Sequence, residues 1–403
     1  MLATAHFEKP LLTTPFHARA RAASQRDRFI AWAGYSTVEV FTSVEREYFA
    51  IRNSASLYDL TPMVKYRVRG TDAARYLNRL VTRDITRLAI GRVAYVAWCN
   101  DAGEIIDDGT LFRLSESEYR LCTAERQLDW LLAAAIGFDV EITDVTPELA
   151  ALSLQGPTAC AVLRAAGLGG IERLRPFEFA TFPWPGTGVS GARVAISRTG
   201  FTADLGYELW MDPELAEPVW DALMRAGLDS RVRPIGSAAL DIARIEAGFL
   251  QPGVDFVNAE RTLRVGTART PLELDLAWIV DFDKGHFSGR RALLAQRRSG
   301  LRRRLVGLDV QGIHPARDAL LYADRRAKRR IGHVTSATWS PTCKRNIALA
   351  FVDAPHEALG GSVWAEIYLN RERTWERRMV PARIVERGFF VHERRRATPP
   401  ADT

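Results

Sequence analysis

The C-terminal quarter of the chain sets the tightest constraint on its fold, because it reads as short strands separated by turns. Five segments after about residue 300 are rich in β-branched and aromatic side chains: RRLVGLDV, RIGHVTSATW, IALAFV, SVWAEIYL and MVPARIVE. Short strands at this regular spacing are typical of an all-β barrel or sandwich. We therefore predict a separate C-terminal β-barrel domain over residues 296–392 and a flexible tail over 393–403.

The region before this domain mixes strands with helices. In MVKYRVR (63–69) the apolar Val64, Tyr66 and Val68 alternate with basic residues, which predicts a half-buried strand followed by a turn and a helix. Further strands are expected at 93–99, 104–113 and 118–123, joined by a hairpin and followed by a helix at 124–135. This order predicts an α+β fold, with helices on one face of a largely antiparallel sheet.

Composition places the chain among ordinary globular proteins. Its residues are 47% hydrophobic and 26% charged, and a length of 403 residues is enough for two or three domains. No apolar run approaches the roughly 20 residues of a membrane span, and MLATAHFEKP at the N-terminus lacks the features of a signal peptide. The four cysteines have no paired spacing that would indicate a metal site or a disulfide framework. We expect a cytoplasmic protein with no metal and no membrane partner.

The net charge of +7 is concentrated late in the chain. Arginine clusters occur in QRRSGLRRR (296–304), DRRAKRR (324–330) and ERRR (393–396). We interpret them first as solvated surface, and second as a site of attraction for an anionic ligand such as a carboxylated substrate. Nucleic-acid binding is not expected, because the clusters lack interleaved aromatic residues and no recognition motif accompanies them.

The segment NDAGEIIDDGTLF (100–112) places two adjacent carboxylates on a strand directly after a tight turn. Neighbouring side chains on a strand point to opposite faces, so Asp107 and Asp108 are expected to have different roles. One would face a cleft and the other would be hydrogen-bonded into the scaffold. Such a pair near a turn is by itself more often a solvated or capping feature than a catalytic one.

Seven segments occur in a fixed order along the chain: LYDLTPM (57–63), GRVAYVAWCNDAGEIIDD (91–108), SLQGP (153–157), RTGFTADLGYEL (198–209), ARIEAGF (243–249), HFSGRRAL (286–293) and GHVTSATWSPTCKRNIALAFV (332–352). Together they resemble the glycine cleavage T-protein family of folate-dependent aminomethyltransferases and their relatives. The resemblance implies a three-domain ring around a folate channel. Residues 1–54 and 141–295 would form the folate-binding core domain, residues 55–140 a ferredoxin-like insert, and the barrel would close the ring.

The resemblance also implies a site for tetrahydrofolate. Asp107 matches the family's catalytic aspartate, whose carboxylate would hold the pterin and stabilise cationic character during transfer, with Asp108 as its structural support. Glu208 matches the glutamate that accepts two N–H bonds from the aminopyrimidine edge. Tyr95 and Met63 match residues that line the folate site.

Trp278 and Arg244 fall in matching segments and are also predicted to bind folate. Each has a plainer alternative. Trp278 would then fill the core, and Arg244 would anchor its helix through a salt bridge to Glu246.

Departures from the family pattern shape the functional prediction. Leu240 stands in place of an arginine, Phe201 in place of a tyrosine and Asp204 in place of a glutamate. Leucine lacks the bidentate guanidinium that binds folate and substrate in the family pattern. Because Asp107 and Glu208 are kept, we predict a tetrahydrofolate-dependent demethylase that takes a methyl group from a small sulfonium, quaternary ammonium or methoxyl donor.

Two alternatives stay open beside the demethylase. One is the aminomethyltransferase of glycine cleavage. The other, less favoured, is a non-catalytic folate-binding assembly factor, because GFLQPGVDF (248–256) stands where such proteins have K-G-C-Y-x-G-Q. A methoxyl donor would need an acid for its leaving oxygen, and the sequence offers Tyr35, Tyr58 and His17 without ranking them.

Overall fold

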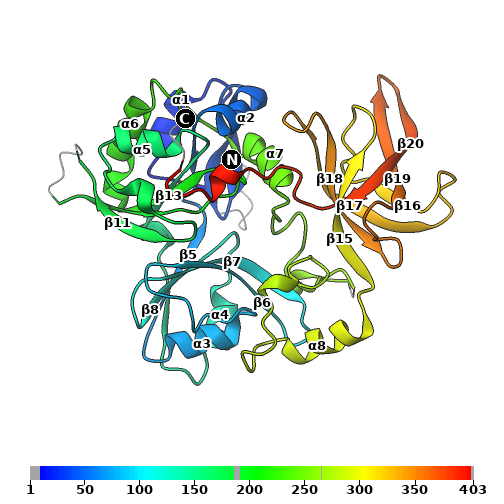
Figure 1. Cartoon of the computed structure of the whole chain (residues 1–403), viewed down its shortest axis with the longest axis horizontal. Coiled ribbons are helices and arrows are strands. Elements are labelled where there is room, and N and C mark those ends of the chain that lie inside the picture. Colours follow the sequence, from blue (N-terminus) through cyan, green and yellow to red (C-terminus); the bar gives the residue numbers. More distant parts are fainter. Residues whose placement is uncertain (1–9, 186–190, 265, 401–403) are drawn as a thin grey trace, which may run out of the picture.

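A computed structural model describes residues 10–185, 191–264 and 266–400 (Figure 1). These residues form three lobes: a mixed domain that contains both the first and the middle part of the chain, an α+β insert, and a β-barrel (Figure 1). Residues 1–9, most of the segment tested for a signal peptide, lie outside the described part.

The first domain is built on two sheets. A three-stranded sheet has the order β1-β3-β2, and a six-stranded sheet has the order β11-β12-β13-β10-β4-β14. The strands are β1 (Leu12–Thr13), β2 (Arg28–Trp32), β3 (Tyr35–Val40), β4 (Ser56–Asp59), β10 (Ala150–Gln155), β11 (Phe179–Pro183), β12 (Arg193–Ser197), β13 (Gly206–Met211) and β14 (Arg233–Pro234). The helices are α1 (His17–Ala23), α2 (Val44–Asn53), α5 (Ala159–Ala165), α6 (Ala216–Ala226) and α7 (Ser237–Ala247).

A glycine determines where helix α7 ends. Gly248 ends the helix in the left-handed region, at φ 72°, which a side chain rarely adopts. A Cβ atom at this position would lie 2.3 Å from the carbonyl oxygen of Arg387, so only glycine lets the segment after the barrel pass this close. The helix end is thereby fixed against the last part of the chain.

The insert is a five-stranded antiparallel sheet covered by helices on one face. Its order is β6-β7-β8-β5-β9, with β5 (Val64–Arg69), β6 (Val93–Cys99), β7 (Ile105–Arg113), β8 (Glu118–Thr123) and β9 (Glu141–Asp144). Helices α3 (Ala73–Leu80) and α4 (Leu128–Ala134) pack on Tyr66, Val68 and Trp98 of the sheet. The predicted strands at 93–99 and 118–123 are confirmed, as is the α+β class.

The face of this sheet opposite the helices is buried, although the strand at 63–69 was predicted to be only half-buried. Lys65 is fully buried, and its Nζ donates to the carbonyl of Thr61 at 2.6 Å. This face packs on the first domain, where the Arg120 guanidinium lies 4.4 Å from the ring centroid of Trp210 on β13. Burial lowers the pKa of Lys65 to about 8. Alternation alone could not reveal a second domain on the polar face.

The domain boundaries also lie away from the predicted ones. Strand β4 belongs to the first domain and β9 to the insert, so the insert's sheet spans 64–144. Residues 272–293 were assigned to the core domain, but Leu272, Phe287 and Leu293 pack against Cys99 of the insert. Helix α8 (Arg290–Ser299) accordingly lies beside the insert in Figure 1.

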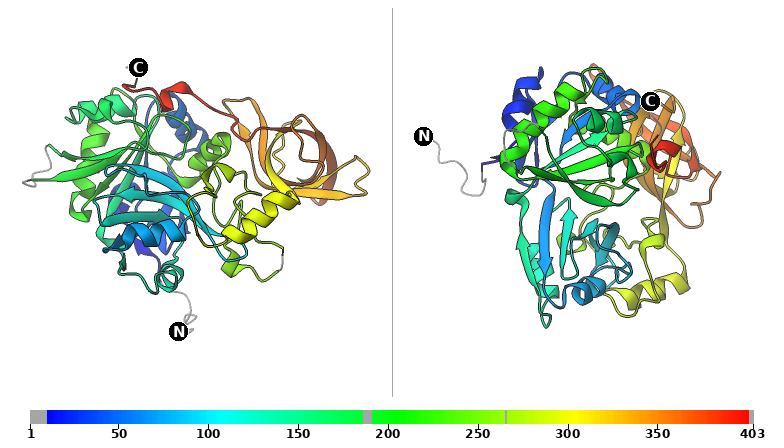
Figure 2. Two further views of the ribbon diagram at one scale, coloured as in Figure 1. Left: turned by 60° about the horizontal axis from the view of Figure 1, so that its bottom comes forward. Right: turned by 60° about the vertical axis from the view of Figure 1, so that its left-hand side comes forward.

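The C-terminal domain is a closed six-stranded barrel, as predicted. Its strands follow one another around the barrel in the order β15-β18-β17-β16-β19-β20 (Figure 2). They are β15 (Arg303–Val310), β16 (Leu320–Tyr322), β17 (Arg330–Ser340), β18 (Arg345–Asp353), β19 (Ser362–Arg371) and β20 (Thr374–Val385). Strand β16 was not predicted, because three residues are too few to display alternation.

The tail was predicted to be flexible from residue 393, and this prediction is wrong as far as residue 400. After the barrel the chain returns to the first domain, where Glu393–Arg395 form a short 3-10 helix (Figures 1 and 2). Arg394 forms an ion pair with Asp204, and Arg198 donates to the carbonyl of Ala397 at 2.6 Å. Residues 401–403 lie outside the described part.

Within the described ranges, each helix is too short or too polar to cross a membrane.

Candidate active site

Strand β7 carries the two carboxylates and directs them to opposite faces of the insert. Asp107 is opposite Trp98 in the ladder, and Asp108 is opposite Ala97. Asp107 therefore faces the loop before α4, whereas Asp108 faces Tyr95 on β6. The alternation of a strand predicted this separation, and the structure confirms it. Both side chains are buried, so neither carboxylate faces open solvent.

Asp107 accepts hydrogen bonds on both oxygens. Its Oδ1 accepts from the backbone N–H of Asp108 at 2.9 Å, and its Oδ2 accepts from Nε2 of Gln127 at 3.4 Å. Burial, together with the neighbouring Asp108, raises the pKa of Asp107 well above its ordinary value. The hydrogen bonds act in the opposite direction, because both donors favour the ionised carboxylate.

Asp108 anchors an aromatic pair that leads to the surface. The Tyr95 hydroxyl donates to Oδ2 of Asp108. Burial raises the pKa of Asp108 to about 6, against the lowering effect of this hydrogen bond. The Tyr95 ring stacks on Trp278 with the ring centroids 5.9 Å apart. Because Trp278 is 63% exposed, its alternative role as core filler is wrong.

A cleft of about 480 Å³ has Trp278 in its lining. It is lined by Arg83, Asp84, Arg87, Trp278, Ile279, Val280, Asp281, Phe282, Asp283 and Arg297. Arg83 joins the cleft to the aromatic pair, since its Nη1 donates to the Tyr95 carbonyl at 3.2 Å and its guanidinium lies 5.8 Å from the Trp278 ring. Asp108, Tyr95 and Trp278 therefore form one connected group beside an open cleft, whereas Asp107 points to the other face of the sheet.

Glu208 lies on β13 of the first domain, where it is buried opposite Ser153 and Ser197. The Thr199 hydroxyl donates to Oε2 at 2.5 Å. Burial raises the pKa of Glu208 to about 6, and the Thr199 hydroxyl and Arg120 limit the rise. Within the described residues, no hydrogen bond joins Glu208 to Asp107 or Asp108.

Met63 and Arg244 have mainly internal contacts. Met63 is half-buried against the cluster that contains Tyr58 and Phe112. Every nitrogen of the Arg244 guanidinium has a protein partner: Nε donates to Asp241, Nη1 donates to Phe249 O and to Asp255 at 2.5 Å, and Nη2 donates to Ser336 and lies 2.8 Å from Asp241 Oδ1. The structure therefore places Arg244 as a link between α7 and β17.

The salt bridge predicted between Arg244 and Glu246 does not form. Glu246 instead pairs with Arg52 at 2.6 Å and accepts from the hydroxyl of Tyr48 at 2.6 Å. Residues two positions apart on a helix point in different directions, so Arg244 and Glu246 reach different neighbours.

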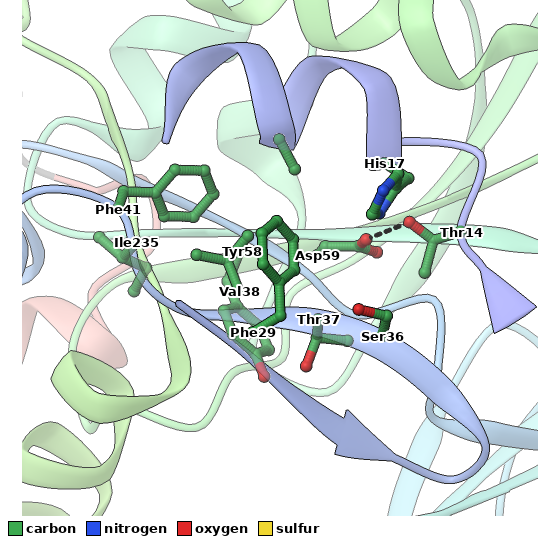
Figure 3. A pocket seen from close by; sticks show the side chains of 11 residues that line it. Thr14, His17, Phe29, Ser36, Thr37, Val38, Phe41, Tyr58, Asp59 and Ile235 are labelled. Carbon is green, nitrogen blue, oxygen red and sulfur yellow. Dashed lines mark hydrogen bonds between the residues drawn. The ribbon is translucent and has the colours of Figure 1, made fainter. Parts of the chain in front are cut away.

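His17 and Tyr58, two of the acids proposed for a leaving oxygen, line a small cavity in the first domain. The cavity has a volume of about 10 Å³. Figure 3 shows the Thr14 hydroxyl pointing at Asp59 near His17, with an oxygen–oxygen distance of 2.6 Å. Such a space is about the size of one water molecule, too small for a methylated donor. Tyr35, the third proposed acid, is 4% exposed.

Three residues near the carboxylates carry no clear signal in the sequence. The Gln127 side-chain amide donates to Asp107, and Asn258, 131 residues further along the chain, donates to Gln127. Arg120 is buried between Phe112 and Trp210, and its Nε and Nη2 have no hydrogen-bond partner among the described residues. In the described part, no three His, Cys, Asp or Glu side chains are placed to hold a metal ion.

Comparisons with known proteins place the chain in a family. Residues 17–284 match the model of the GCVT N-terminal domain, and residues 303–390 match the glycine cleavage T-protein C-terminal barrel domain. The "Aminomethyltransferase" of Rubrobacter xylanophilus is 35% identical over 388 residues, covering 95% of each chain. That of Caldanaerobacter subterraneus is 32% identical over 367 residues, covering 90% of this chain and 92% of the relative.

A solved structure agrees with these matches. The glycine cleavage system aminomethyltransferase T from Bartonella henselae superposes with a TM-score of 0.80 at 28% identity, covering 94% of this chain and 98% of the other. The three-domain T-protein fold is therefore confirmed.

The prediction of a demethylase with a methylated donor is wrong. Relatives that match over most of both chains are named aminomethyltransferases, so the alternative reading fits better. The departures that suggested a new donor have structural roles instead. Phe201 stacks on Phe249 with centroids 5.5 Å apart, Leu240 packs in the core beside α2, and Asp204 pairs with Arg394.

Two matched family domains and relatives that span nearly the whole chain lead to one conclusion. The chain belongs to the glycine cleavage T-protein family and is a one-carbon group transferase.

Proposed function

We propose that the protein is a tetrahydrofolate-dependent aminomethyltransferase, which takes an aminomethyl group from a lipoyl-bound donor and transfers its carbon to tetrahydrofolate. The observation that carries this proposal is the buried carboxylate pair on β7, in which Asp107 is held by two donors and Asp108 joins the Tyr95–Trp278 pair at the cleft. A fixed carboxylate in a dry site stabilises positive charge that develops during transfer far better than one in water. The names of the relatives support the aminomethyl donor.

Glu208 and Arg120 offer complementary groups for a pterin. A buried, ionised Glu208 would accept two N–H bonds from the aminopyrimidine edge, as a carboxylate does from any planar pair of donors. Arg120 brings two buried nitrogen atoms, Nε and Nη2, without hydrogen-bond partners among the described residues, and pterin oxygen and nitrogen acceptors would satisfy them. In this proposal the pterin, a flat and polar heterocycle, binds against these two groups.

The exposed Trp278 face fits the other end of folate. In this proposal the aminobenzoyl ring stacks at the Tyr95–Trp278 pair, and the glutamate end extends into the adjoining cleft toward Arg83. Met63 would contribute apolar contact near the pterin. Aromatic surfaces of this kind bind a ring at small entropic cost because they are already ordered.

A single-turnover assay tests the proposal. The protein is mixed with tetrahydrofolate and a dihydrolipoyl compound that carries a ¹³C-labelled aminomethyl group, and folate products are followed by mass spectrometry. We expect the label on folate and release of ammonia. Betaine and a methoxyl compound serve as control donors and should leave folate unlabelled. Labelled folate from a control donor alone would refute the proposal.

A further inference from the structure

A buried arginine on β8 lacks the partners that other buried arginines of the protein have. Arg120 is 7% exposed, and its Nε and Nη2 atoms have no hydrogen-bond partner among the described residues. Arg52 and Arg244 are buried to a similar degree, and every guanidinium nitrogen of each donates to a protein oxygen. A buried charged donor without an acceptor costs free energy, so Arg120 differs from an arginine that serves the fold alone.

Aromatic rings hold the Arg120 guanidinium without accepting hydrogen bonds in its plane. The central carbon of the guanidinium lies 4.4 Å from the ring centroid of Phe112 and 4.4 Å from that of Trp210. The two rings meet edge-on, with their centroids 5.4 Å apart. Such contacts stabilise a cation over a ring face. They offer no lone pair in the plane in which Nε and Nη2 donate, so these two atoms remain available to a ligand.

Arg120 shares a face of the insert sheet with Asp108. Side chains an even number of positions apart on a strand point to the same face, so Asp108 and Phe112 of β7 lie on one side of the sheet. Arg120 is opposite Phe112 in the ladder and lies on that side too. Its contact with Trp210 shows that this side packs on the first domain. The unpaired nitrogen atoms are therefore on the same side of the sheet as the Asp108 carboxylate that accepts from Tyr95.

The first domain brings Glu208 close to this guanidinium. Glu208 and Trp210 are two positions apart on β13, so their side chains leave that strand on the same face. Burial lowers the pKa of Arg120, and the neighbouring Cys122 and Glu208 oppose this effect. The two charges thus interact while Nε and Nη2 stay unpaired in the described part of the chain. An acceptor and a donor stand near one another here, and neither is used up by the other.

This combination matches one edge of a 4-oxopteridine. In the proposed function, the aminopyrimidine edge of the pterin donates two N–H bonds to Glu208. The group that follows on this edge is the 4-oxo oxygen, which only accepts, whereas a guanidinium only donates. A 4-aminopteridine carries an NH₂ group at that position and would point hydrogen atoms at the Arg120 donors. Its binding would leave these buried donors unpaired.

We propose that Arg120 is a specificity-determining residue, whose guanidinium binds the 4-oxo oxygen of the pterin and makes the site reject 4-aminopteridines. The inference rests on the proposed function, because it concerns the orientation of the same pterin. It also has a consequence for the ligand-free protein: a buried guanidinium that waits for a ligand does not stabilise the fold.

Two ligands that differ at the 4-position of the pterin test the inference. Tetrahydrofolate and its 4-amino-4-deoxy analogue are titrated calorimetrically, and the ratio of their dissociation constants is compared between proteins. We expect the natural protein to prefer tetrahydrofolate at least about tenfold, and Arg120→Met, which has no donor, to lose about tenfold of its preference. Glu208 meets both ligands in both proteins, so its own preference cancels in this comparison. An unchanged ratio in Arg120→Met would overturn the proposal.

Two further variants separate the donor from its charge. Arg120→Lys should keep most of the preference, because an ammonium group also only donates. Arg67→Met is the matched control, since Arg67 is opposite Arg120 in the ladder of β5 and β8, but its side chain is 40% exposed and lies 3.8 Å from Glu148. Its ratio should equal that of the natural protein. A loss of preference as large as in Arg120→Met would attribute the effect to net charge and refute the role of Arg120.

Thermal unfolding distinguishes a ligand-binding role from a structural one. Without ligand, Arg120→Met should unfold at the same temperature as the natural protein or a higher one, because an apolar side chain replaces an unpaired charge. Saturating tetrahydrofolate should raise the unfolding temperature of the natural protein more than that of the variant. A less stable ligand-free variant with an unchanged ligand ratio would assign Arg120 to the fold instead. If the natural protein binds neither ligand, the proposed function fails and this inference with it; if it binds both equally, only this inference fails.

Discussion

Arg394 in the last short helix forms a two-pronged ion pair with Asp204 of the first domain, with Nε–Oδ1 and Nη2–Oδ2 distances of 2.5 and 2.7 Å. The Asp204 carboxylate is completely buried, and Arg52 lies on its other side at 3.5 Å. The segment that leaves the barrel is thereby fastened to the domain in which the chain began. The pair closes a loop of the fold that spans 190 residues.

We predict that Arg394→Ala destabilises the protein by about 3 kcal/mol, because removing one partner leaves a buried carboxylate poorly paired. Urea denaturation followed by fluorescence measures the change. The control is Arg378→Ala, which breaks an ion pair with Glu376 whose side chains are 42% and 39% exposed, so it should destabilise the protein much less. Equal effects of the two substitutions would show that the tail does not fasten the fold.

The two carboxylates should separate in function. Asp107→Ala is expected to lower the transfer rate at least about 100-fold, the usual cost of losing a preorganised electrostatic group. Asp108→Ala should leave most of the activity but lower stability by about 1–3 kcal/mol, because the Tyr95 hydroxyl loses its acceptor. Single-turnover rates and thermal unfolding of both variants check this. The same loss of turnover in two folded variants would contradict the division.

The features that could be predicted from the sequence are those that local periodicity determines. Alternation located the barrel strands and separated Asp107 from Asp108, since both follow from the two-residue repeat of a strand. It could not show that a second domain covers Lys65, nor that Asn258 reaches Gln127 across 131 residues. Contacts of this length depend on how the domains are packed, and no local pattern records them.

The error about the donor has the same origin. Phe201, Leu240 and Asp204 depart from the family pattern, and a sequence comparison cannot tell a changed substrate from a changed neighbour. In the fold each has a structural partner: Phe249, the core beside α2, and Arg394. A residue can therefore depart from the family pattern because of its packing or ion-pair partner, without any change of donor.

Folate binding should depend on pH through Glu208. Its pKa is raised from 4.5 to about 6, so the ionised form that accepts N–H bonds is lost as pH falls through about 6. We expect the dissociation constant for tetrahydrofolate to rise between pH 7 and 5 in the natural protein. Glu208→Gln should bind about 10-fold more weakly at pH 7.5 and lose this dependence. Quenching of tryptophan fluorescence measures both.

The raised pKa of Glu208 also makes the ligand-free protein less stable as pH rises. Between pH 4.5 and about 6 the folded state holds the Glu208 proton more tightly than the unfolded state. The contribution of this side chain to the free energy of unfolding therefore falls across that window. Comparing urea midpoints of the natural protein and Glu208→Gln at the two ends of the window isolates it, and a contribution that grows with pH would contradict its sign.

Arg244 should prove structural. Lysine supplies three donors from a single nitrogen and cannot reach Asp241, Asp255 and Ser336 together, so Arg244→Lys is expected to lower stability by about 2–3 kcal/mol. Folate affinity of the folded variant should stay within about twofold of the natural value, because every nitrogen of Arg244 already has a protein partner. A large loss of affinity without a loss of stability would assign Arg244 to the folate site.

Trp278 should show the opposite behaviour. The side chain is 63% exposed, so Trp278→Ala removes little buried surface and should change the free energy of unfolding by less than about 1 kcal/mol. It also removes the outer ring of the stack on Tyr95, where folate's aromatic ring is proposed to bind. Loss of one aromatic contact should weaken tetrahydrofolate binding about tenfold. Trp375→Ala on β20 is the matched control, since Trp375 is 69% exposed on the barrel and lies outside the cleft. Calorimetric titration of both variants decides the matter: equal affinities would remove Trp278 from the site, and weaker binding in Trp278→Ala alone would locate one end of folate on this exposed ring.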